Sequence, residues 1–138
     1  MFQELALQIA QKAHAGQVDK AGKDYILHPI TVASYMDTDI EKTIAYLHDV
    51  LEDTDVTVDA LRKIFPNEIV DTLITLTHRK DESYFEYIQR VSKSKLAKKV
   101  KVADLLHNLD ITRIKEPTKQ DYERLEKYKK AILYLTTH

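Results

Sequence analysis

The sequence predicts an all-α protein folded as one compact domain. Only two glycines and three prolines occur in 138 residues, too few for the many tight turns of a sheet-rich fold. No long segment alternates apolar and polar residues as a half-buried strand does. Lys and Leu are the two most frequent residues, and both favour helices. We therefore expect seven to nine helices in a single domain that spans residues 1–138 and is large enough to bury most of its apolar surface.

Helix start and stop signals divide the first half of the chain. Glycine ends helices, proline favours the first turn, and short polar side chains cap N-termini. A residue before proline is pushed away from the α region, so we expect His28 at the junction of a loop and a helix. The predicted elements are a helix at 2–15 stopped by Gly16, a loop at 17–28, a helix opened by Pro29 and ending near Met36, and a helix capped by Asp39 that carries His48 and ends near Thr54.

The second half of the chain shows the same signals. Ser83, followed three residues later by Glu86, forms a capping box, which predicts a helix that runs to about Val91. The other predicted elements are a helix at 58–64 capped by Thr57, a helix begun by Pro66 and running to about Leu76, a helix capped by Ser94 with Leu96, Val100, Ala103 and Leu106 as its buried stripe, and, after Pro117, a last helix capped by Thr118 with Leu125, Tyr128, Ile132 and Leu135 inward.

The composition excludes several functional classes. Net charge is −1, so the chain has no global basic field for nucleic acid. With no cysteine, disulfides, iron–sulfur clusters and thiolate zinc sites are excluded. No signal peptide opens the sequence, and no apolar run approaches the thickness of a bilayer. We therefore expect a cytoplasmic protein without nucleic-acid or membrane partners, and the sequence leaves its oligomeric state open.

Four ionisable side chains crowd the segment 44–54, which otherwise reads as a buried helix. On a helix, residues four apart share a face, so His48 stacks with Glu52 and Asp49 with Asp53. Burying such groups beside a core is costly unless they are paired or coordinate a cation. The acidic pair alone could be a solvated helix end. Together with the adjacent His-Asp pair, it predicts a functional site.

Two further segments complete this site. His28 precedes a helix, and Asp104 lies on a later helix with Asn108 on the same face. The side chains of His28, His48, Asp49 and Asp104 together form a set of nitrogen and oxygen ligands without thiolate. Such a set suits Mn²⁺, Fe²⁺ or Zn²⁺ better than Ca²⁺. Four protein ligands leave room for water and a phosphate oxygen on a six-coordinate ion. The acidic pair at 52–53, just outside these ligands, would orient that water or move its protons.

The order and spacing of these residues, H…HD…D, resemble those of HD-domain metal-dependent phosphohydrolases. The chain is more closely similar to the hydrolase domain of RelA/SpoT-type alarmone enzymes, whose stand-alone forms are the small alarmone hydrolases, including the Mesh1-like group. The resemblance runs nearly end to end. It rests on Ala13-His14-Ala15-Gly16-Gln17, Lys20, Tyr25-Ile26-Leu27-His28-Pro29, His48-Asp49-Val50-Leu51-Glu52-Asp53-Thr54, Leu76-Thr77 and Lys101-Val102-Ala103-Asp104-Leu105-Leu106-His107-Asn108-Leu109.

The resemblance implies a compact all-α HD fold, usually one Mn²⁺, and hydrolysis of the stringent-response nucleotide (p)ppGpp with release of its 3′-diphosphate as pyrophosphate. Fe²⁺ and Zn²⁺ remain alternative metals. Carried over by position, it assigns His28, His48, Asp49 and Asp104 as metal ligands, Glu52 and Asp53 as the catalytic acidic pair, and Lys20, Asn108 and Tyr128 as contacts to the nucleotide.

Three further residues are singled out from the sequence itself. Tyr25 joins Tyr128 as a pocket candidate. Lys101 is the residue of the basic cluster at 93–101 best placed to steer a polyphosphate, because it lies one turn before Asp104. We expect His107 to have a structural role.

One position departs from the family pattern. An Arg-Lys pair is common in the loop after Gly-Gln, and here the pair is Asp19-Lys20. A carboxylate cannot stack on a purine as a guanidinium does, and it repels phosphate. Either the base is held differently, or the substrate is an adenosine analogue, NADPH or another nucleotide diphosphate. Two other readings stay open: an HD-type phosphatase such as a 5′-nucleotidase, and a catalytically silent nucleotide-binding domain.

Overall fold

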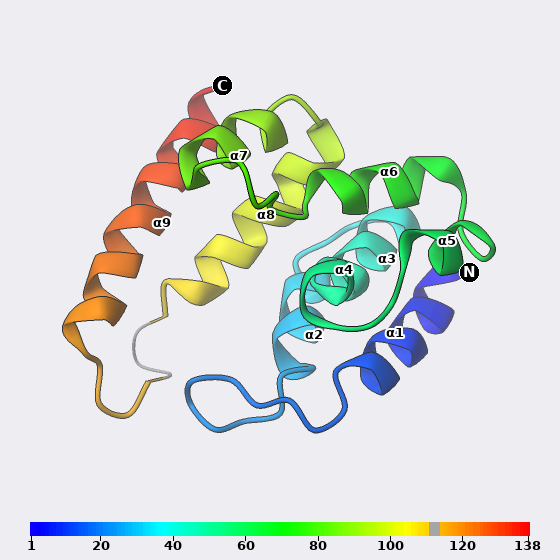
Figure 1. Cartoon of the computed structure of the whole chain (residues 1–138), viewed down its shortest axis with the longest axis horizontal. Coiled ribbons are helices and arrows are strands. Elements are labelled where there is room, and N and C mark those ends of the chain that lie inside the picture. Colours follow the sequence, from blue (N-terminus) through cyan, green and yellow to red (C-terminus); the bar gives the residue numbers. More distant parts are fainter. Residues whose placement is uncertain (111–113) are drawn as a thin grey trace.

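The computed structural model describes residues 1–110 and 114–138, and within these ranges the chain forms nine α-helices and one isolated β-bridge, between Val18 and Asp24. The all-α prediction is confirmed. No helix in the described ranges is both long and apolar enough to cross a membrane. The helices (Figure 1) are α1 (Phe2–Ala13), α2 (Leu27–Ser34), α3 (Asp39–Leu47), α4 (Val50–Asp53), α5 (Val58–Arg62), α6 (Asn67–Thr75), α7 (Tyr84–Val91), α8 (Lys95–Asn108) and α9 (Lys119–Thr137).

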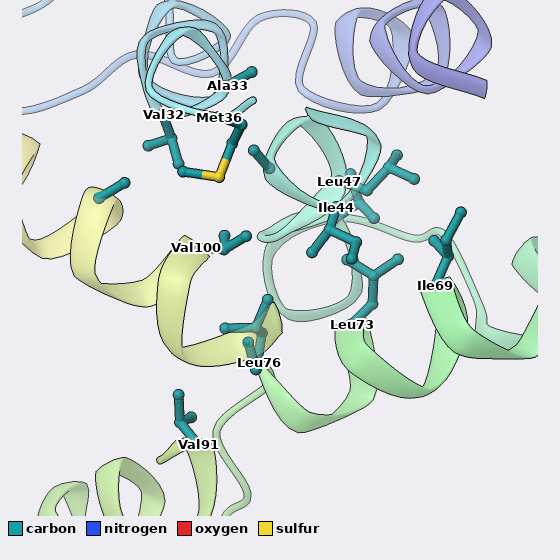
Figure 2. Packing of buried hydrophobic residues seen from close by; sticks show 14 of the residues in the cluster. Val32, Ala33, Met36, Ile44, Leu47, Ile69, Leu73, Leu76, Val91 and Val100 are labelled. Carbon is teal, nitrogen blue, oxygen red and sulfur yellow. The ribbon is translucent and has the colours of Figure 1, made fainter. Parts of the chain in front are cut away.

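Helix α3 lies at the centre of the packing, against α1, α2, α6 and α8. Its apolar face is fully buried, and Figure 2 shows Ile44 and Leu47 beside Ile69 and Leu73 of α6. Val100 of α8 belongs to the same cluster. Burying each large aliphatic side chain contributes about 1.5–3 kcal/mol before entropy is counted. The residues that directly follow α3 are therefore attached to the best-packed part of the molecule.

Most predicted helix starts are confirmed because their caps form. The side chains of Thr57, Ser83, Ser94 and Thr118 each accept a hydrogen bond from a backbone amide in the first turn of α5, α7, α8 and α9. The N-termini of α7 and α9 are full capping boxes. Each such cap contributes about 1 kcal/mol. These polar signals lie in the local sequence, which explains why they could be found without a structure.

The predicted cap of α3 is wrong by one residue. Thr38 is the N-cap and forms a capping box with Glu41. Asp39 instead uses its carboxylate to accept hydrogen bonds from the backbone amides of Phe2, at 3.1 Å, and Gln3, at 3.3 Å. A carboxylate beside the N-terminus of α1 also interacts favourably with the positive end of the helix dipole. Asp39 thus joins α1 to α3, a contact between distant segments that no local pattern contains.

Three other expectations are corrected. The predicted helix through His48 is interrupted, since α3 ends at Leu47 and α4 begins at Val50 after a two-residue turn. Helix α2 begins at Leu27 rather than at Pro29. Leu106, expected in the buried stripe of α8, is 52% exposed. The inward face at that end of α8 is centred on a buried carboxylate two residues earlier, which is about 200° away around the helix.

Arg90 of α7 fixes the segment 76–83 that follows α6. Its guanidinium donates to the carbonyl oxygens of Thr75 at 2.8 Å and Thr77 at 3.0 Å. It also forms an ion pair with Glu82 at 2.6 Å, and both side chains are largely buried. These are charge-assisted hydrogen bonds in a fixed planar geometry. The segment therefore has a defined position against the core although it contains no helix.

We predict that Arg90→Met lowers the free energy of unfolding by roughly 2–4 kcal/mol, because two carbonyl groups and a carboxylate lose a charged donor. Urea denaturation at pH 7 measures this loss. The control is Arg62→Met, whose pair with Asp71 has side chains 38% and 64% exposed. That substitution should cost less than about 1 kcal/mol. Equal losses in the two variants would contradict the structural role of Arg90.

The Arg90 effect should also depend on pH. The hydrogen bond from Arg90 is the main cause that lowers the pKa of Glu82 to about 2. Because the folded-state pKa is depressed, the contribution of the pair is complete above the unfolded value of about 4.3 and is lost as the pH falls toward 2. The stability difference between wild type and Arg90→Met should therefore shrink across that window.

Candidate active site

Three predicted site residues from distant segments meet in one buried cluster. The Nε2 atom of His28 lies 2.7 Å from Oδ1 of Asp104, and Nε2 of His48 lies 3.4 Å from the same oxygen. One nitrogen or oxygen from each residue lies within 4.8 Å of the other two. His28 comes from the first turn of α2, His48 from the turn after α3, and Asp104 from α8. The fold thus brings α2, the turn after α3 and α8 together at one point.

Asp49 stands beside this cluster. Its Oδ2 lies 3.0 Å from Nε2 of His48 and accepts the hydroxyl hydrogen of Tyr25. Burial raises the pKa of Asp49, but the charge and hydrogen bond of His48 outweigh it and leave the value at about 2. The carboxylate is therefore ionised at neutral pH. Tyr25, predicted as a pocket residue, holds one oxygen of Asp49.

The imidazole of His48 turns its Nε2 atom toward the carboxylates of the cluster. Its Nδ1 lies 2.6 Å from the carbonyl oxygen of Ala45, and because a carbonyl only accepts, Nδ1 carries the proton. Nε2 is buried and faces the carboxylate oxygens of Asp49 at 3.0 Å and Asp104 at 3.4 Å, but it completes no hydrogen bond among the described residues. Burial lowers the pKa of His48, but the charges of Asp49 and Asp104 raise it by more, so Nε2 holds a proton that a divalent cation would replace. A buried polar atom left unpaired is costly and rare. Nearby carboxylates and imidazoles make a divalent cation the group that fits this donor set.

Asp104 is held by its own helix. Lys101 Nζ lies 2.9 Å from Oδ2, and Asn108 Nδ2 donates to Oδ1 at 3.1 Å. Burial alone would raise the pKa of Asp104. Lys101 and the two histidines lower it by more, so the pKa lies well below its usual range. The sequence assigned Lys101 and Asn108 to substrate. In the structure both contact Asp104, and Asn108 also lines the cavities described below.

His107 has a contact that the sequence did not reveal. Its ring stacks on that of His28, with centroids 4.9 Å apart and planes 10° apart. Their Nδ1 atoms are 2.7 Å apart, so one donates and the other accepts. For Nε2 of His28 to offer a lone pair to a cation, Nδ1 must carry the proton and His107 must accept it. With a cation on Nε2, His107 would thus accept from Nδ1 and hold His28 in that tautomer.

We predict that His107→Leu weakens Mn²⁺ binding by about 10–100-fold, as expected when the partner of a ligating histidine is lost. His107→Gln retains an acceptor oxygen and should recover most of the affinity. Isothermal titration of metal-stripped protein measures both values. Thermal unfolding of the stripped proteins shows whether the fold is intact. Equal weakening in the two variants would mean that His107 only fills space.

The acidic pair lies on α4, directly after the turn that carries His48. Glu52 accepts a hydrogen bond at 2.9 Å from the backbone amide of His78, in the segment that Arg90 fixes. Burial, and then the charges of Asp49 and Glu52, raise the pKa of Asp53. A carboxyl group of raised pKa beside such a cluster is suited to proton transfer.

Two cavities open on the cluster from different sides. The larger, about 290 Å³, is lined by His28 and the smaller, about 160 Å³, by His48. Asn108 and Tyr128 line both cavities, so the cluster lies where they adjoin. Tyr25 and Lys20 also border the larger cavity. Four of the five predicted substrate contacts thus face this space, and the fifth, Lys101, lines the smaller cavity.

The larger cavity contains an ionic network that the sequence did not reveal. Asp121, in the first turn of α9, is buried and binds Lys20 at 3.3 Å and Arg124 at 2.5 Å. Asp19, the position that departs from the family pattern, accepts hydrogen bonds through Oδ1 from the amides of Ala21 at 2.8 Å and Lys23 at 3.0 Å. The carboxylate of Asp19 therefore stabilises the turn of its own loop. Arg124 supplies a guanidinium to this cavity from a different element.

Comparisons with known proteins agree with this geometry. The family model for the HD domain matches residues 6–133. The chain is 36% identical over 132 residues to a guanosine-3′,5′-bis(diphosphate) 3′-pyrophosphohydrolase of Borreliella burgdorferi, with 84% of this chain and 20% of that protein covered. It is 31% identical over 128 residues to a probable GTP pyrophosphokinase of Mycobacterium leprae, with 83% and 16% covered.

A solved structure gives the same result for the fold. It is that of a metazoan ortholog of SpoT that hydrolyzes ppGpp and plays a role in starvation responses, and it matches with a TM-score of 0.82 at 25% identity over 97% of this chain and 84% of that one. The chain therefore belongs to the HD-domain family, whose members bind divalent metals. It spans about a fifth or less of the length of the two curated relatives.

Proposed function

We propose that residues 1–138 act as one HD-type hydrolase domain that removes the 3′-diphosphate from a (p)ppGpp-like alarmone as pyrophosphate. The observation that carries this proposal is the buried Nε2 atom of His48, which completes no hydrogen bond among the described residues and lies in the His28–His48–Asp104 cluster beside an acidic pair. The names of the relatives in Borreliella burgdorferi and Metazoa support it for substrate. The intact cluster argues against a catalytically silent domain.

The cluster fits a divalent cation, and we assign Mn²⁺ to it, with Fe²⁺ or Zn²⁺ as alternatives. Bound there, a cation supplies Lewis acidity and a water of lowered pKa. The residues that would hold it are His28, His48, Asp49 and Asp104. Lys101 and Asn108 keep Asp104 oriented, while Tyr25 keeps Asp49 and His107 keeps His28 oriented.

In the reaction, one water is consumed. The water oxygen bonds to the phosphorus that carries the 3′ oxygen. The bond between this phosphorus and the 3′ oxygen breaks, and one proton of the water is transferred to the 3′ oxygen. Glu52, held by the amide of His78, orients the water, and Asp53, with its raised pKa, carries the proton. The products are pyrophosphate and a nucleotide with a free 3′ hydroxyl.

The nucleoside would occupy the larger cavity. Tyr25 and Tyr128 offer ring surface there, and Lys20 and Arg124 offer positive charge. Because Asp121 holds both cations, they are pre-positioned rather than free to swing. A guanidinium that packs against a base can thus come from Arg124 on α9, which accounts for a carboxylate at position 19 without a change of substrate class.

We predict that Mn²⁺-loaded protein converts ppGpp to GDP and pyrophosphate in equal amounts, and that removal of the metal by a chelator abolishes turnover until Mn²⁺ is restored. Product analysis by anion-exchange chromatography measures this. Orthophosphate as product would favour a phosphomonoesterase. Inert ppGpp with rapid turnover of NADPH or another nucleotide would exclude the alarmone. Protein that binds no metal and remains inactive would favour the silent domain.

We further predict that Glu52→Gln retains the metal but lowers kcat by about 100-fold or more, as expected for a lost proton-handling group. His48→Ala should lose metal and activity together, because the unpaired donor atom is gone. Metal content by elemental analysis, measured beside kcat, separates the two cases. Loss of metal from Glu52→Gln would mean that Glu52 is itself a ligand.

A further inference from the structure

The smaller cavity is lined mostly by polar, charged and aromatic residues, and two of them, Tyr84 and Lys127, have no role in the reaction proposed above. Of the twelve residues that line it, only Leu76 and Leu105 are aliphatic. One side of it comes from the turn after α3 and from α4, which carry Asp49 and Glu52. The rest includes residues of α7, α8 and α9; Figure 1 shows α7 and α9 on the side of α8 away from α4. That second wall carries cations and hydroxyl donors.

Tyr84, at the start of α7, contributes a buried hydroxyl to this wall. Its oxygen is shielded from solvent and has no hydrogen-bond partner among the described residues. Burial raises the pKa of Tyr84, so the hydroxyl keeps its proton at neutral pH and remains a donor. Such a group is costly to leave unpaired inside a protein. An acceptor that enters the cavity would satisfy it.

Lys127 of α9 contributes a cation without a carboxylate partner in the described part of the chain. Its Nζ lies 4.4 Å from the ring centroid of Tyr84 and 5.6 Å from that of Tyr128. Burial, and then the neighbouring charges of Arg124 and Lys101, lower its pKa. Lys101 and Lys127 thus both line the smaller cavity, and the two aromatic rings hold Lys127 in place.

Lys101 connects this wall to the cluster. Its side chain is 14% exposed and binds Asp104, and its Nζ lies 5.1 Å from the ring centroid of Tyr87. An anion that contacts Lys101 would therefore lie directly beside the candidate cation site. Lys127 and Tyr84 would contact the part of the anion that lies farther along the same cavity.

We propose that Lys127 and Tyr84, with Lys101, form a binding site for the terminal phosphate of a diphosphate group. The inference rests on the proposed function for the orientation of the substrate. With the reacting phosphorus at the cluster and the nucleoside in the larger cavity, the terminal phosphate points into the smaller one, which has little more than half the volume. Charge and donors there match a phosphate dianion. This site selects a diphosphate over a monophosphate.

The test uses inorganic pyrophosphate and orthophosphate as probes, titrated calorimetrically into Mn²⁺-loaded protein. Bound metal is quantified before and after, because pyrophosphate chelates Mn²⁺. We expect wild type to prefer pyrophosphate. Lys127→Gln should weaken pyrophosphate about tenfold, and Tyr84→Phe, which deletes one oxygen, by about 3–10-fold, as for a lost hydrogen bond to a charged group. Orthophosphate affinity should change less than twofold in either variant.

Lys129→Gln is the matched control. It lies on the same helix and its ion pair with Glu126 has side chains 60% and 67% exposed. It removes the same charge and should leave pyrophosphate affinity within twofold of wild type. An equal loss in Lys129→Gln, unchanged affinity in both site variants, or no preference for pyrophosphate in wild type would each overturn the inference.

The titration needs no nucleotide, so the two proposals fail separately. Release of pyrophosphate from ppGpp by variants that bind pyrophosphate as wild type does would keep the proposed function and discard this site. Pyrophosphate binding that depends on Lys127 and Tyr84, in a protein that does not hydrolyse ppGpp, would keep the site and discard the alarmone.

Discussion

The burial of His28, His48 and Asp104 is the constraint on which the rest of this structure depends. Three ionisable side chains at 3–5% exposure must each have partners inside the protein. Lys101 and the neighbouring polar groups supply them for almost every donor and acceptor. The exception is Nε2 of His48, which faces the carboxylates of Asp49 and Asp104 without completing a hydrogen bond among the described residues. Within this cluster, one buried nitrogen is thus left with the chemistry of a metal ligand.

The scaffold holds this position from several sides. Helix α3 is enclosed by four other helices, and Asp39 fixes the N-terminus of α1 to it. The chain turns after α3, so that His48 enters the cluster while the short helix α4 presents Glu52 and Asp53 at its rim. On the other side, Arg90 fixes the segment that offers the His78 amide to Glu52. Stability and function therefore share the same contacts.

Local sequence predicted much of this arrangement. Caps such as Ser83 and Thr118 form because their partners lie three residues away. The convergence of His28, His48 and Asp104 could be inferred because ionisable residues in apolar segments need one another. The turn after α3 could not be predicted, since the apolar pattern continues through it. Contacts between distant segments, such as the stacking of His107 on His28, also leave no periodic signal.

The residues of the smaller cavity show the same limit. Lys127 lies in a charged stretch of α9 that reads as a solvated face. The tertiary packing of α7 against α9 sets the ring of Tyr84 beside its ammonium group, which has no carboxylate partner in the described part of the chain. Arg124 was missed for the same reason, although it faces the larger cavity one turn before Tyr128.

The central claim is that His28 and His48 bind a divalent cation through nitrogen in the buried cluster. Pulsed electron paramagnetic resonance of the Mn²⁺-loaded protein tests it directly, because nitrogen coordinated to Mn²⁺ modulates the electron-spin echo. We predict coupling to two imidazole nitrogens in the wild-type protein. A spectrum without imidazole nitrogen coupling, from protein that holds one Mn²⁺, would place the ion elsewhere and contradict the account.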